Sequence, residues 1–149
     1  MESCSTPYAI RQYRAEDEHE VVALWNLCMS RDEIVLNTFR RKIILDANFD
    51  PRSCFVTLGE EKIVVALKDN KVVGFSHFLD ERFGPFGIDK ACSGLGLEPM
   101  LYYYTVDQMR RKGRHNLWLA WTTGRTKDFY HKVGLKVLRR HEVMKKIIA

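Results

Sequence analysis

A turn with two glycines precedes a segment of helical character, and this combination is suited to binding an anion. The turn reads ACSGLG over residues 91–96, and LEPMLYYY follows it. The first N–H groups of a helix have no partner within the helix, and the helix dipole favours negative charge there. Gly94 and Gly96 lack a Cβ, so a phosphate could approach the main chain. For two glycines taken alone, a plain tight turn is the simpler interpretation.

Other phosphate, thiol and metal chemistries fit the sequence less well. No Lys-Ser or Lys-Thr pair follows the glycines, which excludes a Walker A loop, and Pro99 replaces the third glycine of the dinucleotide-binding pattern GxGxxG. Cys92 stands near a helix start, where a thiolate is stabilised, but no histidine adjoins it in sequence to activate it. Because the chain has no HxxxH, HExxH or CxxC pattern, no metal site is expected.

The spacing of apolar residues predicts the elements that must position this turn. Helices are expected within residues 14–30, 36–47, 97–113 and 126–133, and strands at 8–13, 63–67, 72–79, 83–88, 117–121 and 135–144. Asp17 and Glu20 resemble a capping box for the first helix. Asp69 and Asn70 tolerate positive φ and predict a two-residue hairpin turn. The unbroken apolar run at 117–121 is typical of a central strand covered on both faces.

The order of these elements predicts an α/β fold of the mixed α+β kind. A central mixed, mostly antiparallel sheet would carry helices on both of its faces. No repeat or linker interrupts the 149 residues, so one domain spanning 1–149 is expected. The chain has no run of about 20 apolar residues and no secretory signal. Its four cysteines are widely spaced, so a cytoplasmic protein with free thiols is expected.

Charge is distributed unevenly along the chain. Residues 110–149 hold 12 Lys or Arg and two Asp or Glu, a net charge of +10. The whole chain carries +5, so the preceding residues carry −5. A basic C-terminal third suggests a partner that bears phosphate, either a nucleotide cofactor or a nucleic acid. A solvated basic face explains the same charge without any partner.

Several motifs together resemble the GNAT superfamily of N-acetyltransferases. They are FGPFGI at 83–88, GLG in the turn, a helix that ends in RRKG, and KDFYHKVGLKV at 127–137. The most specific piece is FYHKVG at 129–134, and the resemblance covers nearly the whole chain. It implies a GNAT-like fold and acetyl-CoA as the cosubstrate.

The resemblance also implies which residues would contact the cofactor. Backbone groups of Phe86, Gly87 and Ile88 would pair with the pantetheine arm, as a strand edge pairs with an extended ligand. One of their N–H groups would polarise the thioester carbonyl. Phe129 would pack on the cofactor. The N–H groups that would hold the pyrophosphate are those of Cys92, Ser93, Gly94, Leu95 and Gly96.

Two side chains are candidates for proton transfer. Tyr130 occupies the place where many members of the family keep a tyrosine that protonates the departing thiolate. A phenol with a pKa of about 10 is still protonated at neutral pH, so it can act as this acid. His77 is the best candidate for the base, ahead of Asp80 and Glu81, because its unperturbed pKa is about 6.5. A histidine satisfied within a strand is the plainer interpretation of His77.

The predicted function is transfer of an acetyl group from acetyl-CoA to an amine of a small molecule or peptide, by direct attack in a ternary complex. Neither a nucleic acid nor a membrane is expected as a partner, and the resemblance is compatible with a homodimer. Aromatic side chains could line the acceptor pocket, although at such spacings they are more often core; they are Trp25, Phe83 and Trp121.

The turn departs from the family pattern, and this leaves a second class of function open. The family's loop normally begins with Arg or Gln, whereas this chain has Ala91, followed by Cys92 and Ser93 where Gly and a basic residue are common. A binding or regulatory module on the same fold, without catalysis, is therefore the main alternative. A nucleic-acid binder that uses the basic third is the other, although no nucleic-acid-binding motif is present.

Overall fold

The structure is a computed structural model that describes residues 7–29, 33–41, 63–120, 122 and 124–140. Its elements in chain order are β1 (Ala9–Gln12), α1 (Glu18–Cys28), α2 (Leu36–Phe39), β2 (Ile63–Lys68), β3 (Lys71–Leu79), β4 (Arg82–Ile88), α3 (Leu97–Arg111) and α4 (Gly124–Lys132). Short 3-10 turns at Ala15–Asp17 and Lys90–Cys92 precede α1 and α3. Within these residues, no helix combines the length and the apolar character that a bilayer span requires.

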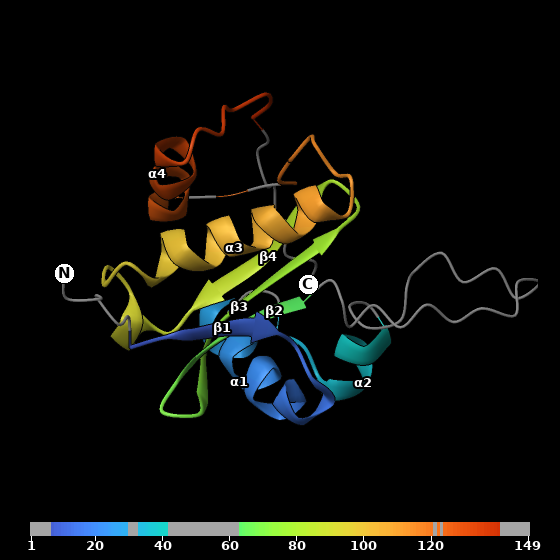
Figure 1. The fold of residues 1–149 in the computed structure, drawn as a ribbon, viewed down its shortest axis with the longest axis vertical. Coiled ribbons are helices and arrows are strands. Elements are labelled where there is room, and N and C mark those ends of the chain that lie inside the picture. The colour runs from blue at the N-terminus through green and yellow to red at the C-terminus, as the bar shows by residue number, and fades with distance from the viewer. Residues whose placement is uncertain (1–6, 30–32, 42–62, 121, 123, 141–149) are drawn as a thin grey trace, which may run out of the picture.

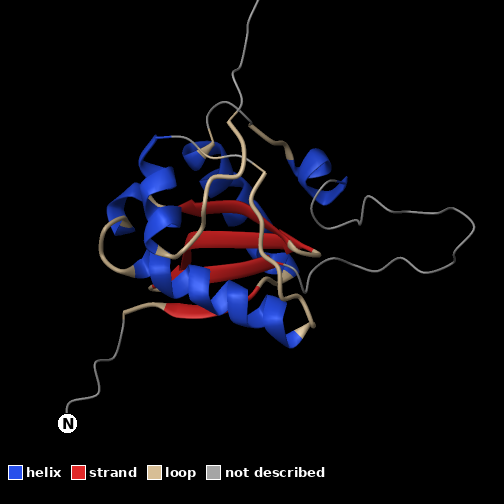
Figure 2. Cartoon of the chain, turned by 90° about the horizontal axis from the view of Figure 1, so that it is seen from above, coloured by secondary structure: helices blue, strands red, loops and turns tan. Residues whose placement is uncertain are grey.

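The four strands form one antiparallel sheet in the order β1-β2-β3-β4, with α1 on one face and α3 on the other (Figure 1). Viewed from above, the helices enclose the strands on both sides (Figure 2). The only parallel contact in the described part of the chain is an isolated bridge between Arg82 and Trp118. The predicted α+β class, with helices on both faces of a mostly antiparallel sheet, is confirmed.

Alternation along the strands divides the core into two layers. Val65 and Phe75 face α1, and the Phe75 ring stacks on Trp25 at a centroid distance of 5.6 Å. Val64 and Ala66, the neighbours of Val65, face α3 instead. Because both faces are covered, β2 is buried from Ile63 to Ala66 and has no polar side chain there.

The hairpin between β2 and β3 forms as the sequence predicts. Asp69 and Asn70 have φ values of 51° and 61°, which match the two left-handed residues of a type I′ turn. The turn sets the register of the hairpin, in which Lys68 lies opposite Lys71. A β-bulge between Ala66 and Leu67 then shifts this register, so Val72 and Phe75 both pack in the cluster that contains Trp25.

Two predicted strands need correction. The run at 117–120 makes only the bridge at Trp118, and Trp118 is half-exposed while Leu117 and Leu119 pack inward, so one face of this segment is buried rather than two. Residues 135–140 form no strand. Positions 121 and 141–144 of the two predicted strands lie outside the described residues, as do positions 42–47 of the predicted second helix.

The predicted capping box of α1 is also wrong, because both acids have other partners. The carboxylate of Asp17 accepts two hydrogen bonds from the guanidinium of Arg11 and one from the N–H of Arg14. Glu20 accepts a hydrogen bond of 2.6 Å from the N–H of Val72, at the start of β3. Glu20 therefore fastens α1 to the sheet instead of capping its own helix.

A bidentate ion pair joins α1 to the segment after α2. The Glu18 carboxylate accepts from Nε and Nη2 of Arg40 at 2.7 and 2.6 Å. The hydrogen bonds from Arg40 hold the pKa of Glu18 below its ordinary value, although burial acts in the opposite direction. A carboxyl group with a lowered pKa in the folded state stabilises the protein above its unfolded pKa of about 4.3. That contribution is lost as the pH falls through the folded pKa.

We expect the free energy of unfolding to fall less steeply below about pH 5 in Glu18→Gln than in the wild type. Because Arg40 is half-exposed, solvent screening limits the contribution of the pair to roughly 1 kcal/mol or less. Urea unfolding between pH 3 and pH 7 measures this. Glu16→Gln is the matched control, since Glu16 is exposed and lies 3.5 Å from Arg14. Equal slopes for Glu18→Gln and the wild type would contradict the assignment.

Candidate functional site

One edge of β4 carries the first part of the candidate site. The start of β4 is bonded to the neighbouring segment, since Phe83 donates to the Trp118 carbonyl at 2.9 Å and Trp118 donates to the Glu81 carbonyl at 3.1 Å. Beyond Phe83, no described residue forms a backbone hydrogen bond to this side of β4. The strand and the neighbouring segment therefore diverge.

The peptide groups of Phe86 and Ile88 point toward this open edge. Asp89 donates to the Val73 carbonyl, and Gly87 lies opposite Phe75, so these residues bond to β3. Successive residues of an antiparallel strand alternate in direction, which turns the groups of Phe86 and Ile88 away from β3. The Ile88 carbonyl accepts a weak hydrogen bond of 3.3 Å from the thiol of Cys28. An extended ligand could pair with the remaining groups as an added strand does.

A bulge interrupts β4 just before this edge. Ser76 lies opposite Phe86 and Phe78 lies opposite Phe83, so β4 has two residues, Gly84 and Pro85, where β3 has one. His77 is that one residue, and its Nδ1 lies 3.3 Å from the Gly84 carbonyl. The imidazole is only 2% exposed. The predicted base therefore adjoins the bulge from within the sheet.

The loop before α3 is the second part of the candidate site. Gly94 and Gly96 have φ values of 77° and 86°. Apart from the chain neighbours, no atom of the described part of the chain lies within 4 Å of the place where a Cβ would stand on either residue. The outer side of the loop is therefore open. Gly96 is the N-cap of α3, and Pro99 lies in the first turn, as the sequence predicts.

Most donors of this loop already have acceptors. Cys92 N–H donates to the Asp89 carbonyl, and Ser93 N–H makes a longer bond of 3.3 Å to the Lys90 carbonyl. Gly94 N–H donates to the carboxylate of Glu98 at 2.8 Å. Of the five N–H groups predicted to hold the pyrophosphate, those of Leu95 and Gly96 make no short hydrogen bond to another described residue.

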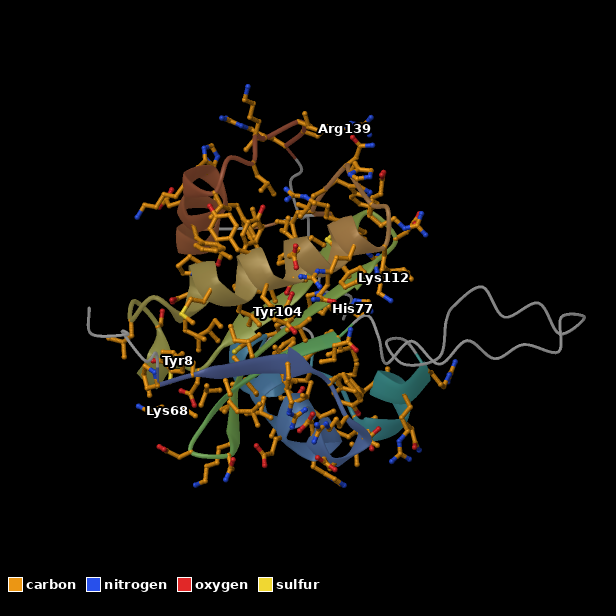
Figure 3. The ribbon with its side chains drawn as sticks, viewed as in Figure 1. Tyr8, Lys68, His77, Tyr104, Lys112 and Arg139 are labelled. Carbon is orange, nitrogen blue, oxygen red and sulfur yellow. The ribbon has the colours of Figure 1, made fainter. Side chains whose placement is uncertain are left out.

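Tyr8 packs beside the same loop. It belongs to the apolar cluster that contains Cys92 and Leu97. Partial burial raises the pKa of the Tyr8 phenol, and the neighbouring Cys92 thiol and Glu98 carboxylate act in the same direction. Figure 3 shows Tyr8 near the N-terminal end of α3 and His77 farther along, toward its C-terminal end.

Helix α4 brings two predicted residues onto β4. The Phe129 ring stacks on Phe86 at a centroid distance of 5.8 Å and an interplanar angle of 5°. The Tyr130 ring meets Phe83 edge-on at 6.2 Å. Burial raises the pKa of Tyr130 well above its ordinary value, with a smaller contribution from Tyr102. The phenol of Tyr130 is therefore fully protonated at neutral pH.

The three aromatic residues predicted for an acceptor pocket are not brought together as a pocket wall. Trp25 is 5% exposed and packs between Phe75 and Phe39 on the α1 face. Phe83 is 1% exposed and packs with Tyr102 and Tyr130 on the α3 face. Trp121 lies outside the described residues. A role of Trp25 or Phe83 in acceptor binding stays a prediction.

Glu98 is a residue of the loop region that sequence reasoning missed. Its carboxylate contacts Gly94 N–H and the Ser93 hydroxyl. A signal was present, because an acidic residue in the first turn of a helix often binds the free N–H groups at that end. Sequence alone does not decide between the two acceptors for those N–H groups, the Glu98 carboxylate and an external phosphate.

The chain is similar to known proteins in its fold and not in its sequence. At the level of sequence, no family model and no curated protein matches the chain. Solved structures match it in shape. A transcriptional regulator from Bacillus halodurans superposes with a TM-score of 0.67 and 17% identity over 93% of this chain and 99% of its own. An acetyltransferase from Trypanosoma brucei gives 0.64 and 14% identity over 93% and 99%.

A third match was solved with a coenzyme A derivative. AAC(6')-Iy, in complex with the bisubstrate analogue CoA-S-monomethyl-acetylneamine, gives a TM-score of 0.64 and 12% identity over 95% of this chain and 99% of its own. The matches agree with the resemblance noted in the sequence. At these identities they show the fold alone, and the chain has the GNAT fold that it shares with acetyltransferases.

Proposed function

We propose that this chain transfers an acetyl group from acetyl-CoA to an amine. The observation that carries the proposal is the open edge of β4, which lies between a bulge and the loop at the start of α3. A ligand with an extended arm and a diphosphate at one end matches such an edge and loop. The fold shared with acetyltransferases, and the coenzyme A derivative bound to one of those proteins, support the choice of ligand.

The edge of β4 fits the pantetheine arm of acetyl-CoA better than the loop fits its diphosphate. Peptide groups of Phe86 and Ile88 would hold the pantetheine arm, and the thioester would then lie toward the bulge at Gly84 and Pro85. The loop offers open space at Gly94 and Gly96, but Glu98 already uses the Gly94 donor. The arm therefore has better partners in this chain than the diphosphate has.

The proposed reaction is a direct transfer. The acceptor nitrogen, once deprotonated, attacks the thioester carbon, the C–N bond forms and the C–S bond breaks. The Tyr130 hydroxyl gives its proton to the departing thiolate, and the second proton that the nitrogen loses as the amide forms restores this hydroxyl through water. His77, which is buried beside the bulge, would receive the proton of the ammonium group through water. A backbone N–H at the edge of β4 would stabilise the oxyanion.

A second candidate function is a binding or regulatory module that has lost catalysis. The specific observation in its favour is the loop, in which Cys92, Ser93 and Gly94 already donate hydrogen bonds within the chain. A protein described as a transcriptional regulator shares the fold, which shows that the fold alone does not decide between the two functions.

Isothermal titration with acetyl-CoA is the experiment that tests cofactor binding. We expect saturable binding of acetyl-CoA and of CoA, with dissociation constants in the micromolar range. The next step is a panel of amines, with release of the free thiol as the readout of transfer. Pantetheine, which lacks the phosphates, serves as the comparison for the arm alone. If neither acetyl-CoA nor CoA binds at near-millimolar concentration, the proposal is wrong.

A further inference from the structure

The carboxylate of Glu98 lies in the middle of the loop proposed for the diphosphate. Its Oε1 accepts a hydrogen bond of 2.8 Å from Gly94 N–H and one of 2.7 Å from the Ser93 hydroxyl. Glu98 is the second residue of α3, where the helix dipole favours a negative charge. An anion therefore already occupies these donors, and this anion belongs to the chain itself.

Beside these donors, the loop keeps the N–H groups of Leu95 and Gly96, but its side chains bring little positive charge. Ala91 N–H donates to Oδ1 of Asp89, so a second acidic side chain is also bound to the loop. Lys90 is the single basic residue in 89–98, against the two acids Asp89 and Glu98. The loop thus has a net negative charge at the place where a diphosphate would bring further negative charge.

The open outer side of the loop allows a ligand to approach despite this charge. Apart from the chain neighbours of each glycine, no atom of a described residue lies within 4 Å of a Cβ placed on Gly94 or Gly96, and Leu95 between them is 63% exposed. The described residues therefore pose no steric barrier to a diphosphate, and the barrier that the loop does present is electrostatic. It lies in the competition of two anions for Gly94 N–H and the Ser93 hydroxyl.

We propose that Glu98 is an intramolecular competitor of the cofactor's diphosphate and sets the affinity of this loop for it. The inference rests on the proposed function, because it takes the loop as the place of the diphosphate. To offer Gly94 N–H and the Ser93 hydroxyl to a diphosphate, the loop must release the Glu98 carboxylate, and the released charge stays close to the phosphates. A ligand without phosphates meets no such competition, so Glu98 favours the pantetheine portion over the phosphate portion of the ligand.

Glu98→Gln isolates the charge, because glutamine has the same size and its carbonyl can still accept from Gly94 N–H. We expect Glu98→Gln to bind CoA and inorganic pyrophosphate about tenfold more tightly than the wild type does, since a neutral acceptor competes less well with phosphate. Glu98→Ala, which removes the acceptor, should show at least the same gain. Isothermal titration gives the affinities, and the amide signal of Gly94 in a nitrogen–proton NMR spectrum reports binding at this loop.

Two controls test whether the effect is specific to Glu98 and to the phosphates of the ligand. Glu16→Gln removes an equal charge from an exposed site next to α1 and should leave both affinities unchanged. Pantetheine should bind the wild type and Glu98→Gln equally. Thermal unfolding checks that each variant is folded.

The outcomes separate this inference from the proposed function. Equal or weaker binding of pyrophosphate and CoA by both Glu98 variants overturns the role of Glu98, and so does the absence of pyrophosphate binding in every variant. If pyrophosphate binds more tightly to Glu98→Gln while CoA and acetyl-CoA bind to no variant, Glu98 competes as proposed and the acetyltransferase function fails alone.

Discussion

Replacement of Tyr130 by phenylalanine should lower the rate of acetyl transfer by on the order of 100-fold, the lower range for loss of a general acid. The ring of Tyr130 is held edge-on against Phe83 of β4, and the neighbouring Phe129 stacks on Phe86. The hydroxyl is thus carried by a ring fixed against the strand that would bind the thioester. Phenylalanine keeps these ring contacts, so affinity for acetyl-CoA and stability should change little. Steady-state kinetics with thiol release, together with isothermal titration, separates the two effects.

Tyr102→Phe is the matched control for Tyr130→Phe. Tyr102 belongs to the same aromatic cluster, is 5% exposed, and burial also raises the pKa of its phenol. It therefore loses a hydroxyl in comparable surroundings, without the proposed contact to the departing thiolate. If the two variants have the same turnover as the wild type, Tyr130 is not the acid. If no variant and no wild-type preparation turns over while CoA still binds, the binding module is favoured.

The parts of the fold that sequence predicted well depend on local chemistry. Asp69 and Asn70 define their turn by the conformations they tolerate, and β2 and β3 follow from it. Helix α3 ends where expected, because Lys112 is its C-cap and Gly113 adopts a φ of 75° just beyond it. In each case the residues that decide the structure are neighbours in sequence.

The predictions that needed correction depend on contacts between distant segments. Glu20 was expected to cap its own helix, but Val72, 52 residues away, supplies its hydrogen bond. The apolar run around Trp118 was expected to fill a central strand, but only alternate side chains of it are buried against the cluster of Phe83 and Tyr130. Apolar composition shows that a segment is partly buried and does not show how many of its faces are covered.

For the candidate site, the sequence predicts which residues take part. It does not show which of their hydrogen-bonding groups are free to bind a ligand. The sequence predicts that Phe86, Gly87 and Ile88 all pair with the cofactor. The strand register shows that the peptide groups of Phe86 and Ile88 point to the open edge, whereas those of Gly87 point to β3. Gly94 and Gly96 indicate the loop from sequence, but only the folded geometry shows that Glu98 already accepts a hydrogen bond from Gly94 N–H. Availability of a donor depends on the folded geometry of every neighbouring acceptor.

Phe83 offers the largest expected effect on stability. It is 1% exposed, and its ring meets Phe86 at 5.7 Å, Tyr102 at 5.3 Å and Tyr130 at 6.2 Å. It joins β4 to both α3 and α4. Truncation to alanine leaves a cavity among these rings, so we expect Phe83→Ala to lower the free energy of unfolding by about 3–5 kcal/mol. Urea unfolding followed by circular dichroism measures this loss.

The same variant tests whether Phe83 belongs to the acceptor pocket. Tyr103→Ala is the control, since Tyr103 also packs against Tyr102 but is 57% exposed, and its loss should cost under about 1 kcal/mol. Phe83→Leu refills most of the cavity and should recover more than half of the lost stability. A wall of the acceptor pocket would behave differently, because truncation would then raise KM for the amine and leave the free energy of unfolding within about 1 kcal/mol of the wild type. Exposure of only 1% favours the first outcome, since almost none of the Phe83 ring is open to an acceptor.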